Sequence, residues 1–274
     1  MLRKDVRKAA AAATTADPSE IARFNALAEE WWKPDGAFKT VHAFNRARIA
    51  LLAERLPRLF GRDPRRPRPL DGLAVADIGC AAGLVTEPLS RLGARVIGID
   101  AAERNIRIAQ RHADATGAAV EYRHALPEQL VEEGTSFDIV LSLEVVEHVA
   151  DLPAFLAALA RLTRPGGILV IGTLNRTLRS YAAAIVGAEH VLRWLPRGTH
   201  DWRRFVRPVE LADGLRPHGL IFAERHGVML NPLTMSWSVH PGTSVAYLQF
   251  HRKRALAADC GGLLSLDTFA GSMP

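Results

Sequence analysis

Two glycines and two aspartates have the spacing of a loop that binds a nucleotide-like cofactor. Residues 76–83 read ADIGCAAG, and they place Gly79 and Gly83 after an apolar run and before a helical pattern. At such a turn the backbone bends sharply and approaches a ligand with no Cβ in the way. Asp100 ends the next apolar run, about where these folds place an acid on ribose hydroxyls. Together with Asp77, these residues predict a cofactor site at the edge of an α/β sheet.

The residues within this loop favour S-adenosylmethionine over a dinucleotide. A dinucleotide places its pyrophosphate at a helix N-terminus, over a G-x-G-x-x-G loop. Here the spacing is G-x-x-x-G, with Ala81 at the position of the middle glycine and Asp77 near the place of the phosphates. Both features disfavour a pyrophosphate, but they suit S-adenosylmethionine, whose amine and sulfonium are cations. A plain strand-to-helix turn without a ligand is the less favoured interpretation.

A second group of reactive side chains follows a later apolar run. In LSLEVVEHV, Glu144, Glu147 and His148 come at the carboxyl end of a predicted strand, the edge where open α/β sheets bind ligands. On a helix, this i, i+3, i+4 spacing would bring two carboxylates and an imidazole to one face, which suits a hard divalent ion or acid–base chemistry. Spacing alone slightly favours the alternative, a capped helix start with ordinary polar contacts.

The elements that must position these residues alternate between strand and helix over residues 73–173. Such alternation predicts βαβ units and a parallel sheet. An amphipathic helix over 177–195, a short helix over 208–215 and closing strands over 220–228 and 244–250 follow. The predicted strands of the first region are 73–78, 95–99, 120–123, 137–143 and 168–173, and its predicted helices are 84–92, 103–116 and 152–162.

We expect an α/β, Rossmann-like class I methyltransferase fold: a mostly parallel seven-stranded sheet with helices on both faces, an N-terminal helical cap and a helical insertion after the fifth strand. The cap begins at Asp17, because Asp-Pro-Ser-Glu supplies an N-cap acid, a proline at N1 and a glutamate at N3. Its second helix covers about 41–56 and precedes a Pro- and Arg-rich loop.

One domain is predicted over residues 17–250, between a disordered tail at 1–16 and a C-terminal tail at 251–274 without a motif. The basic, Ala-rich start also resembles an organellar transit peptide, which is the less favoured interpretation. The parts of the domain are the cap at 17–56, the cofactor-binding core at 70–175, the insertion at 176–207 and the closing helix and strands at 208–250.

The composition limits the classes of protein to which this chain can belong. With 274 residues, 48% of them hydrophobic, the chain can bury a sizeable core. A net charge of +6 is too small to require nucleic acid, so no nucleic-acid partner is expected. Two cysteines, Cys80 and Cys260, are too few for a disulfide framework and suit a reducing cytoplasm. No apolar run approaches the roughly 20 residues that span a bilayer, and no secretory signal is evident, so we expect a soluble or peripheral protein.

Several longer stretches carry a resemblance to a known family. Together they are similar to the ubiquinone-biosynthesis O-methyltransferases of bacteria and mitochondria, over about residues 17–250. The methyltransferase loop is shared by a vast superfamily, so specificity comes from the other segments. The stretches are ARFNALAEEWWKPDGAFKTVHAFNRAR, DIGCAAG, VIGID, LEVVEHV, RPGG, GTLNRT, VGAEHVLRWLPRGTHDWRRFVRP and NPLT. The family usually has DVGCGGG in the loop, where Ala81 and Ala82 here replace two glycines, and a methyl group at 81 would crowd the methionine end of the cofactor.

The resemblance implies methyl transfer to phenolic hydroxyls of polyprenylated intermediates, on a polyprenyl-hydroxyphenol and on demethylubiquinol. It implies that Arg48 pairs with the cofactor carboxylate, Gly79 lines the loop, Asp100 holds the ribose and Leu143 flanks the adenine. Mitochondrial members are reported to bind a divalent metal at positions that match Glu144, Glu147 and His148, which here would be Mg²⁺. The expected cofactor-binding residues are therefore Arg48, Asp77, Gly79, Gly83, Asp100 and Leu143, and the expected catalytic residues are Glu144 and His148.

The implied chemistry needs an activated phenol. A phenol titrates near 10, so at neutral pH it must be activated by a Lewis-acidic Mg²⁺ or by His148 or Glu144 as a base. We expect metal-assisted deprotonation. Orientation and desolvation should provide most of the acceleration.

The insertion over 177–197 is expected to contact an anionic membrane surface, because the substrate's isoprenoid tail stays in the bilayer. The alternatives are that it covers the substrate cleft or mediates a dimer. The enzyme would then work in the cytoplasm beside the inner membrane of a bacterium, or on the matrix side in a mitochondrion, where other ubiquinone-biosynthesis proteins could be partners. The apolar residues of this surface are Tyr181, Ile185, Val186, Val191, Leu192, Trp194 and Leu195, and its basic residues are Arg179, Arg193 and Arg197.

Three other functions are alternatives to this one: an NAD-type oxidoreductase on a similar fold, a methyltransferase of another small phenol, and an inactive scaffold in a quinone-biosynthesis complex. The fold alone does not separate them. Stabilisation by S-adenosylhomocysteine but not by NADH would exclude the oxidoreductase, and turnover of a short-chain demethylubiquinol analogue would exclude the scaffold.

Overall fold

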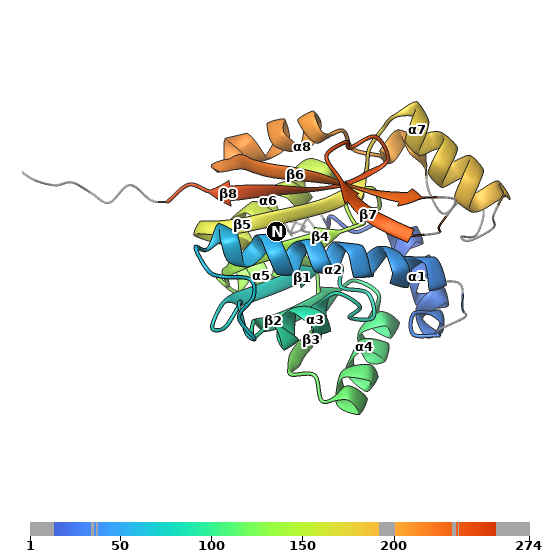
Figure 1. The fold of residues 1–274 in the computed structure, drawn as a ribbon. Helices are drawn as coiled ribbons and strands as arrows, with labels where there is room; N and C mark the ends of the chain where they lie inside the picture. Colours follow the sequence, from blue (N-terminus) through green and yellow to red (C-terminus); the bar gives the residue numbers. More distant parts are fainter. Residues whose placement is uncertain are drawn as a thin grey trace, which may run out of the picture.

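The computed structural model describes residues 14–33, 36, 38–191, 201–231, 234 and 236–255. Its strands are β1 (Ala74–Ile78), β2 (Arg95–Asp100), β3 (Val120–His124), β4 (Phe137–Leu143), β5 (Thr163–Leu174), β6 (Leu220–Asn231), β7 (Ser236–His240) and β8 (Ala246–Lys253). They form one sheet in the order β3-β2-β1-β4-β5-β8-β6-β7 (Figure 1). Strands β1 to β5 are mutually parallel, and β8 lies antiparallel between β5 and β6. This mostly parallel sheet confirms the expected Rossmann-like class.

Helices cover both faces of the sheet. They are α1 (Pro18–Leu27), η1 (Ala28–Glu30), α2 (Lys39–Leu59), α3 (Thr86–Arg91), α4 (Glu103–Thr116), α5 (Pro127–Glu132), α6 (Leu152–Leu162), α7 (Leu178–Ser180), η2 (Tyr181–Val191), η3 (Trp202–Arg204), α8 (Pro208–Leu215) and η4 (Arg216–His218). In β4, Val140 packs in the cluster with α6 and α8, whereas Ile139 and Leu141 pack in the one with α2 and α3. Because both faces are buried, the central parallel strands are apolar at almost every position.

The sheet has one strand more than the seven expected. The additional strand, β7, lies at the edge and pairs with only the end of β6. Four of its five residues are exposed, so it shows no apolar alternation from which a strand could be predicted. The helix α5 was also not predicted, and β5 begins at Thr163 and so includes the predicted turn at 164–167.

The described residues extend slightly beyond the predicted domain at both ends. Thr15 is buried: its backbone N–H donates to Glu128 at 3.0 Å, and its carbonyl accepts from the N–H of Ala150 at 2.9 Å. At the other end, β8 runs to Lys253 because it still pairs with β5 and β6 there. The remainder of the two expected tails, residues 1–13 and 256–274 with Cys260, lies outside the described residues.

The predicted insertion follows β5 as α7 and the π-helix η2. Leu178 and Tyr181 are exposed there, at 82% and 45%. Residues 192–200, which include Leu192, Arg193, Trp194, Leu195 and Arg197, lie outside the described residues, as do the side chains of Val186 and Val191. Within the part of the chain that is described, no helix combines the length and apolar character needed to cross a membrane.

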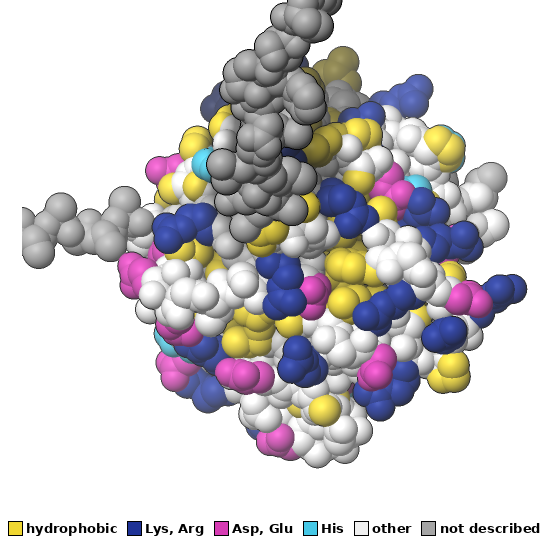
Figure 2. All heavy atoms as spheres, turned by 90° about the vertical axis from the view of Figure 1, so that its left-hand side faces the viewer, with side chains coloured by type: hydrophobic (Ala, Val, Ile, Leu, Met, Phe, Trp, Pro, Cys, Tyr) yellow, Lys and Arg dark blue, Asp and Glu magenta, His cyan; other side chains and the backbone are white. Residues whose placement is uncertain are grey.

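Figure 2 shows the end of the molecule opposite α1 and α7, seen from the left of Figure 1. Lys and Arg side chains are dispersed there among Asp, Glu and apolar side chains. The expectation that nucleic acid is not a partner stays a prediction.

Candidate active site

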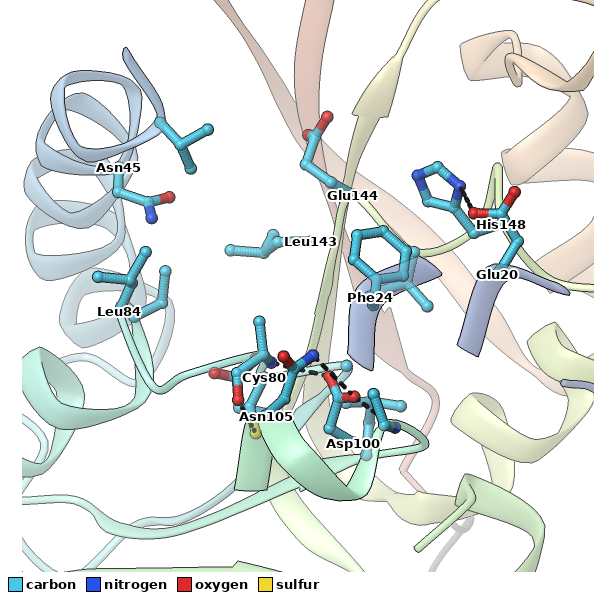
Figure 3. A pocket seen from close by; sticks show the side chains of 18 of the residues that line it. Glu20, Phe24, Asn45, Cys80, Leu84, Asp100, Asn105, Leu143, Glu144 and His148 are labelled. Carbon is cyan, nitrogen blue, oxygen red and sulfur yellow. Dashed lines mark hydrogen bonds and ion pairs between the residues drawn. The ribbon is translucent and has the colours of Figure 1, made fainter. Parts of the chain in front are cut away.

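A cavity of about 650 Å³ lies at the carboxyl ends of the parallel strands (Figure 3). This volume is in the usual range of small-molecule sites, and the position is the one at which open α/β sheets bind ligands. Most residues predicted for the site line this one cavity: Arg48, Asp77, Gly79, Asp100, Leu143, Glu144 and His148. Gly83 and Glu147 do not line it.

The two glycines of the loop after β1 are required by their protein neighbours. Gly79 has φ +76°, and a Cβ there would lie 2.4 Å from Cγ2 of Val145. Gly83 has φ +84°, and a Cβ there would lie 2.0 Å from the hydroxyl oxygen of Tyr122. Between them, Ala81 also has a left-handed backbone, with φ +48°. Alanine is strained in this region, which explains why glycine suits position 81.

Asp100 fastens this loop to the end of β2. Its Oδ2 accepts from the N–H of Ala81 at 2.9 Å, and its Oδ1 accepts from the N–H of Ala102 at 2.7 Å and from Nδ2 of Asn105 at 3.2 Å. Burial raises the pKa of Asp100, and these hydrogen bonds oppose the rise. Because a carboxylate has about four acceptor sites, Asp100 keeps capacity for a ribose hydroxyl.

Asp77 is an almost fully buried acid at the wall of the cavity, 3% exposed. Its Oδ2 accepts from the hydroxyl of Thr86 at 2.6 Å. Burial raises the pKa of Asp77 to about 6, while the Thr86 bond and the charge of Arg48 hold it down. A carboxylate in such surroundings is best stabilised by a cation placed in the cavity.

Arg48 pairs with Glu144. Its Nη1 lies 3.1 Å from Oε1 of Glu144, its Nε donates to Oδ1 of Asn45 at 3.1 Å, and its guanidinium carbon lies 4.1 Å from the centre of the Phe44 ring. Arg48 was expected to hold the cofactor carboxylate, and that role stays a prediction. In the present arrangement, a cofactor carboxylate would share Arg48 with Glu144.

The expected helical face of Glu144, Glu147 and His148 does not form. Residues 144–148 form a turn, because Glu144 continues β4 by donating its N–H to Gly172 and then adopts φ +58°. The three side chains therefore do not share one helical face, and Glu147 and His148 contact partners on other elements. Glu147 Oε2 accepts from the hydroxyl of Thr173 at 2.8 Å, and Nδ1 of His148 lies 3.1 Å from Oε2 of Glu20 (Figure 3).

These positions do not fit a three-ligand metal site. Within the described ranges, no group of three or more His, Cys, Asp or Glu side chains is arranged to hold a metal ion. The two glutamates, in contrast, fit acid–base chemistry. Burial raises the pKa of Glu144 to about 7, aided by the negative charge of Glu147 and opposed by the charges of Arg48 and His148. Oε1 of Glu147 is buried with no hydrogen-bond partner in the described structure.

Several residues of the cavity were not predicted as site residues. Glu20 was noted only as a helix-capping acid, yet it is the partner of His148. Asn105 holds Asp100, and Phe44 and Trp237 form an aromatic wall with their ring centres 4.7 Å apart. These pairs join segments far apart in the chain, and a single sequence carries no signal for such contacts.

Comparisons with known proteins identify methyltransferase relatives of this chain. The family model described as a methyltransferase domain matches residues 76–171. The ubiquinone biosynthesis O-methyltransferase of Sinorhizobium medicae is 49% identical over 237 residues, which are 86% of this chain and 96% of that protein. The protein of the same name from Rhizobium rhizogenes is 50% identical over 238 residues, or 87% and 96% of the two chains.

Solved structures show the same fold at low identity. A magnesium protoporphyrin IX methyltransferase from Synechocystis PCC 6803 with bound SAM has a TM-score of 0.59 and 18% identity, covering 89% of this chain and 100% of that one. The N-methyltransferase NodS from Bradyrhizobium japonicum in complex with S-adenosyl-L-homocysteine has a TM-score of 0.55 and 18% identity, covering 86% and 97%. By its sequence relatives and its fold, the chain belongs to the ubiquinone biosynthesis O-methyltransferase family.

Proposed function

We propose that this chain transfers a methyl group from S-adenosylmethionine to a phenolic hydroxyl of polyprenylated ubiquinone precursors, both the polyprenyl-hydroxyphenol and demethylubiquinol. The observation that carries the proposal is the place of Glu144. This acid lies in one cavity with the loop acids Asp77 and Asp100 and with the aromatic wall of Phe44 and Trp237. One space thus combines groups suited to the cofactor, a base and an apolar acceptor site.

The acids suit the two polar ends of the cofactor. Asp77 would hold its cationic methionine end, which offsets the cost of ionising a buried carboxylate. Asp100 would accept the ribose hydroxyls, and Leu143 with Leu126 would form apolar walls for the adenine. When bound, S-adenosylmethionine supplies an electrophilic methyl group and leaves as a neutral thioether.

Glu144 would take the phenolic proton. With a pKa of about 7, it is partly ionised at neutral pH. A phenol near 10 lies about three pKa units higher, so full transfer to Glu144 would cost about 4 kcal/mol. Arg48, 3.1 Å from Glu144, would lower this cost by stabilising the developing phenolate. Glu144 then carries the proton that the phenol has lost.

The acceptor's isoprenoid tail would leave the cavity beside the aromatic wall. Met229 lines the cavity and is 37% exposed, so the cavity reaches the surface there. Ala183 and Gly187 of η2 line it as well, and the exposed Leu178 and Tyr181 precede them in the chain. We place the anionic membrane surface along 177–197, which would set the protein at the cytoplasmic face of the inner membrane, or at the matrix face in a mitochondrion.

Turnover of a short-chain demethylubiquinol analogue tests the reaction. Glu144→Gln should lower kcat/KM by about 10²–10⁴, the usual contribution of a positioned base. Glu224→Gln removes a carboxylate that pairs with Arg55 outside the cavity, and it should retain activity. If the Glu144→Gln variant turned over the analogue as fast as the wild type does, Glu144 would be excluded as the base.

Metal dependence is tested on the same assay. Direct proton transfer to Glu144 predicts full activity after chelation. Activity that is lost to a chelator and restored by Mg²⁺ would instead assign the deprotonation to a metal, for which His148 would have to leave Glu20.

Sedimentation with anionic vesicles tests the membrane surface. Replacing Arg179, Arg193 and Arg197 by glutamine should weaken binding by about 3 kcal/mol, or about 100-fold, at about 1 kcal/mol for each arginine. A matched control replaces three arginines of the loop after α2, Arg65, Arg66 and Arg68, with the same change in net charge. An equal loss of vesicle binding in the two variants would contradict a membrane surface at 177–197.

A further inference from the structure

Two adjacent tryptophans join the N-terminal cap to the cofactor edge of the core. Trp31 is 8% exposed, and its ring stacks on Phe38 with centres 3.9 Å apart and planes within 5°. Its Nε1 donates to Oδ1 of Asn105 at 3.0 Å. The next residue, Trp32, donates from Nε1 to the carbonyl of Ala82 at 2.9 Å. The cap is thus bonded both to α4 and to the loop after β1.

Trp31 is linked to Asp100 through Asn105. Asn105 is 1% exposed, and its Nδ2 donates to Oδ1 of Asp100 at 3.2 Å (Figure 3). Both ends of this amide are in use: the oxygen accepts from Trp31 and the nitrogen donates to the carboxylate. If the amide of Asn105 were flipped, its NH₂ group would face the N–H of Trp31 and its oxygen would face the carboxylate of Asp100. Trp31 therefore fixes the orientation of Asn105, which in turn holds the carboxylate of Asp100.

Trp32 is linked through His112 to α3, the helix that follows the loop. Its ring stacks on His112 of α4, with centres 3.4 Å apart and planes within 2°. Nδ1 of His112 lies 2.6 Å from Oε1 of Glu87, a residue of α3 that is 1% exposed. Trp32 thus donates to the loop at the Ala82 carbonyl, and its ring packs on His112, which pairs with Glu87 in the helix that follows the loop.

From these contacts we infer that Trp31 and Trp32 are positioning residues for the cofactor site, which couple closure of the cap to cofactor binding. Trp31 acts through Asn105 on the acid assigned to the ribose, and Trp32 acts on the loop that lines the cavity. Trp31 and Phe38 themselves line the cavity, so the cap also forms part of its wall. Coupling is reciprocal: loosening the cap must weaken cofactor binding, and bound cofactor must hold the cap closed. The inference rests on the proposed function for the identity of the cofactor.

Affinity for S-adenosylhomocysteine tests the coupling. Trp31→Phe and Trp32→Phe keep an aromatic ring but remove the N–H donor, so each should raise the Kd by about 2- to 10-fold, the equivalent of one hydrogen bond. Saturating cofactor should restore kcat, and KM for the quinol analogue should not change. The matched control is Trp202→Phe, whose Nε1 donates to the carbonyl of Thr177 at 2.9 Å in the insertion, away from the loop after β1. Its Kd should stay within twofold of the wild type.

Chymotrypsin cleavage after Trp31, Trp32 or Phe38 gives a second measurement, which begins with the wild-type protein. S-adenosylhomocysteine should slow cleavage of the wild-type cap and should slow it less in Trp31→Phe and Trp32→Phe. Variants that lose only thermal stability and keep wild-type affinity would overturn the coupling, as would a wild-type cap that the ligand does not protect. If the wild-type protein bound S-adenosylhomocysteine but did not turn over the quinol analogue, the proposed reaction would be overturned and the coupling would stand.

Discussion

Replacing Asp77 by asparagine should stabilise the ligand-free protein while weakening cofactor binding. Burial raises the pKa of Asp77 from 3.8 to about 6. The folded protein thus holds this proton more tightly than the unfolded chain does. The free energy of unfolding therefore falls as the pH rises between 3.8 and about 6, and at neutral pH the ionised carboxylate is a cost to the fold.

The size of the effect follows from that difference. A rise from 3.8 to about 6 corresponds to about 3 kcal/mol at neutral pH. Asparagine keeps an acceptor for Thr86 but buries an amide nitrogen, which costs about 1 kcal/mol. The net gain of about 2 kcal/mol should raise Tm by about 4–8 °C for a chain of this size. Loss of the charged partner should weaken S-adenosylhomocysteine binding by about 2 kcal/mol, or about 30-fold.

Urea unfolding at pH 5 and pH 7.5 and titration with S-adenosylhomocysteine measure both effects. The variant should show a smaller fall in stability between the two pH values, because Glu144, whose pKa burial also raises, still contributes to it. Asp138→Asn is the matched control, because Asp138 accepts from the N–H of Ala74 at 2.8 Å and from Arg164 at 2.7 Å. Removing this paired carboxylate should destabilise the protein by about 1–3 kcal/mol. An Asp77→Asn variant that is less stable than the wild type at pH 7.5 would refute the reasoning.

Three further predictions concern the loop and the base. Ala81→Gly relieves a left-handed alanine and should raise stability by about 1 kcal/mol in urea unfolding, with S-adenosylhomocysteine bound at least as tightly; a less stable variant would count against strain at 81. Gly83→Ala should cost about 2 kcal/mol through the clash with Tyr122, and Tyr122→Phe in the same chain should recover part of it, whereas additive costs would show that the hydroxyl is not the obstacle. The kcat/KM of the wild type should fall about tenfold for each pH unit below about 7, because Glu144 acts only when ionised, and Glu144→Gln should lack this limb; a limb that persists belongs to another group.

The parallel half of the fold could be predicted closely from the sequence. The predicted bounds of β4 and α6, Phe137–Leu143 and Leu152–Leu162, agree with the structure, as do those of α4 and α8. Strands buried on both faces give continuous apolar runs, and caps such as Asp151 mark where helices begin. The edge strand β7 has neither signal, since its side chains are mostly exposed.

Some of the residues that line the cavity could be predicted from the sequence, but their pairings could not. The loop acids and Glu144 could be found because each ends an apolar strand. That Arg48 meets Glu144, and that His148 turns to Glu20, depends on contacts across 96 and more than 100 residues. The left-handed backbone of Glu144 also has no signal in the sequence, and a turn follows it in place of the helix that the spacing predicts.

The small strand β7 also bears on how the protein behaves at high concentration. A sheet edge with unpaired N–H and C=O groups is a template for another chain, and long flat edges promote aggregation. Without β7, the end of β6 from Gly227 to Asn231 would offer such an edge directly beside the cavity mouth at Met229. A five-residue strand with serines at 236 and 238 leaves a shorter and more polar border in its place. This border is a poorer template for pairing with another copy of the chain than the longer edge of β6 would be.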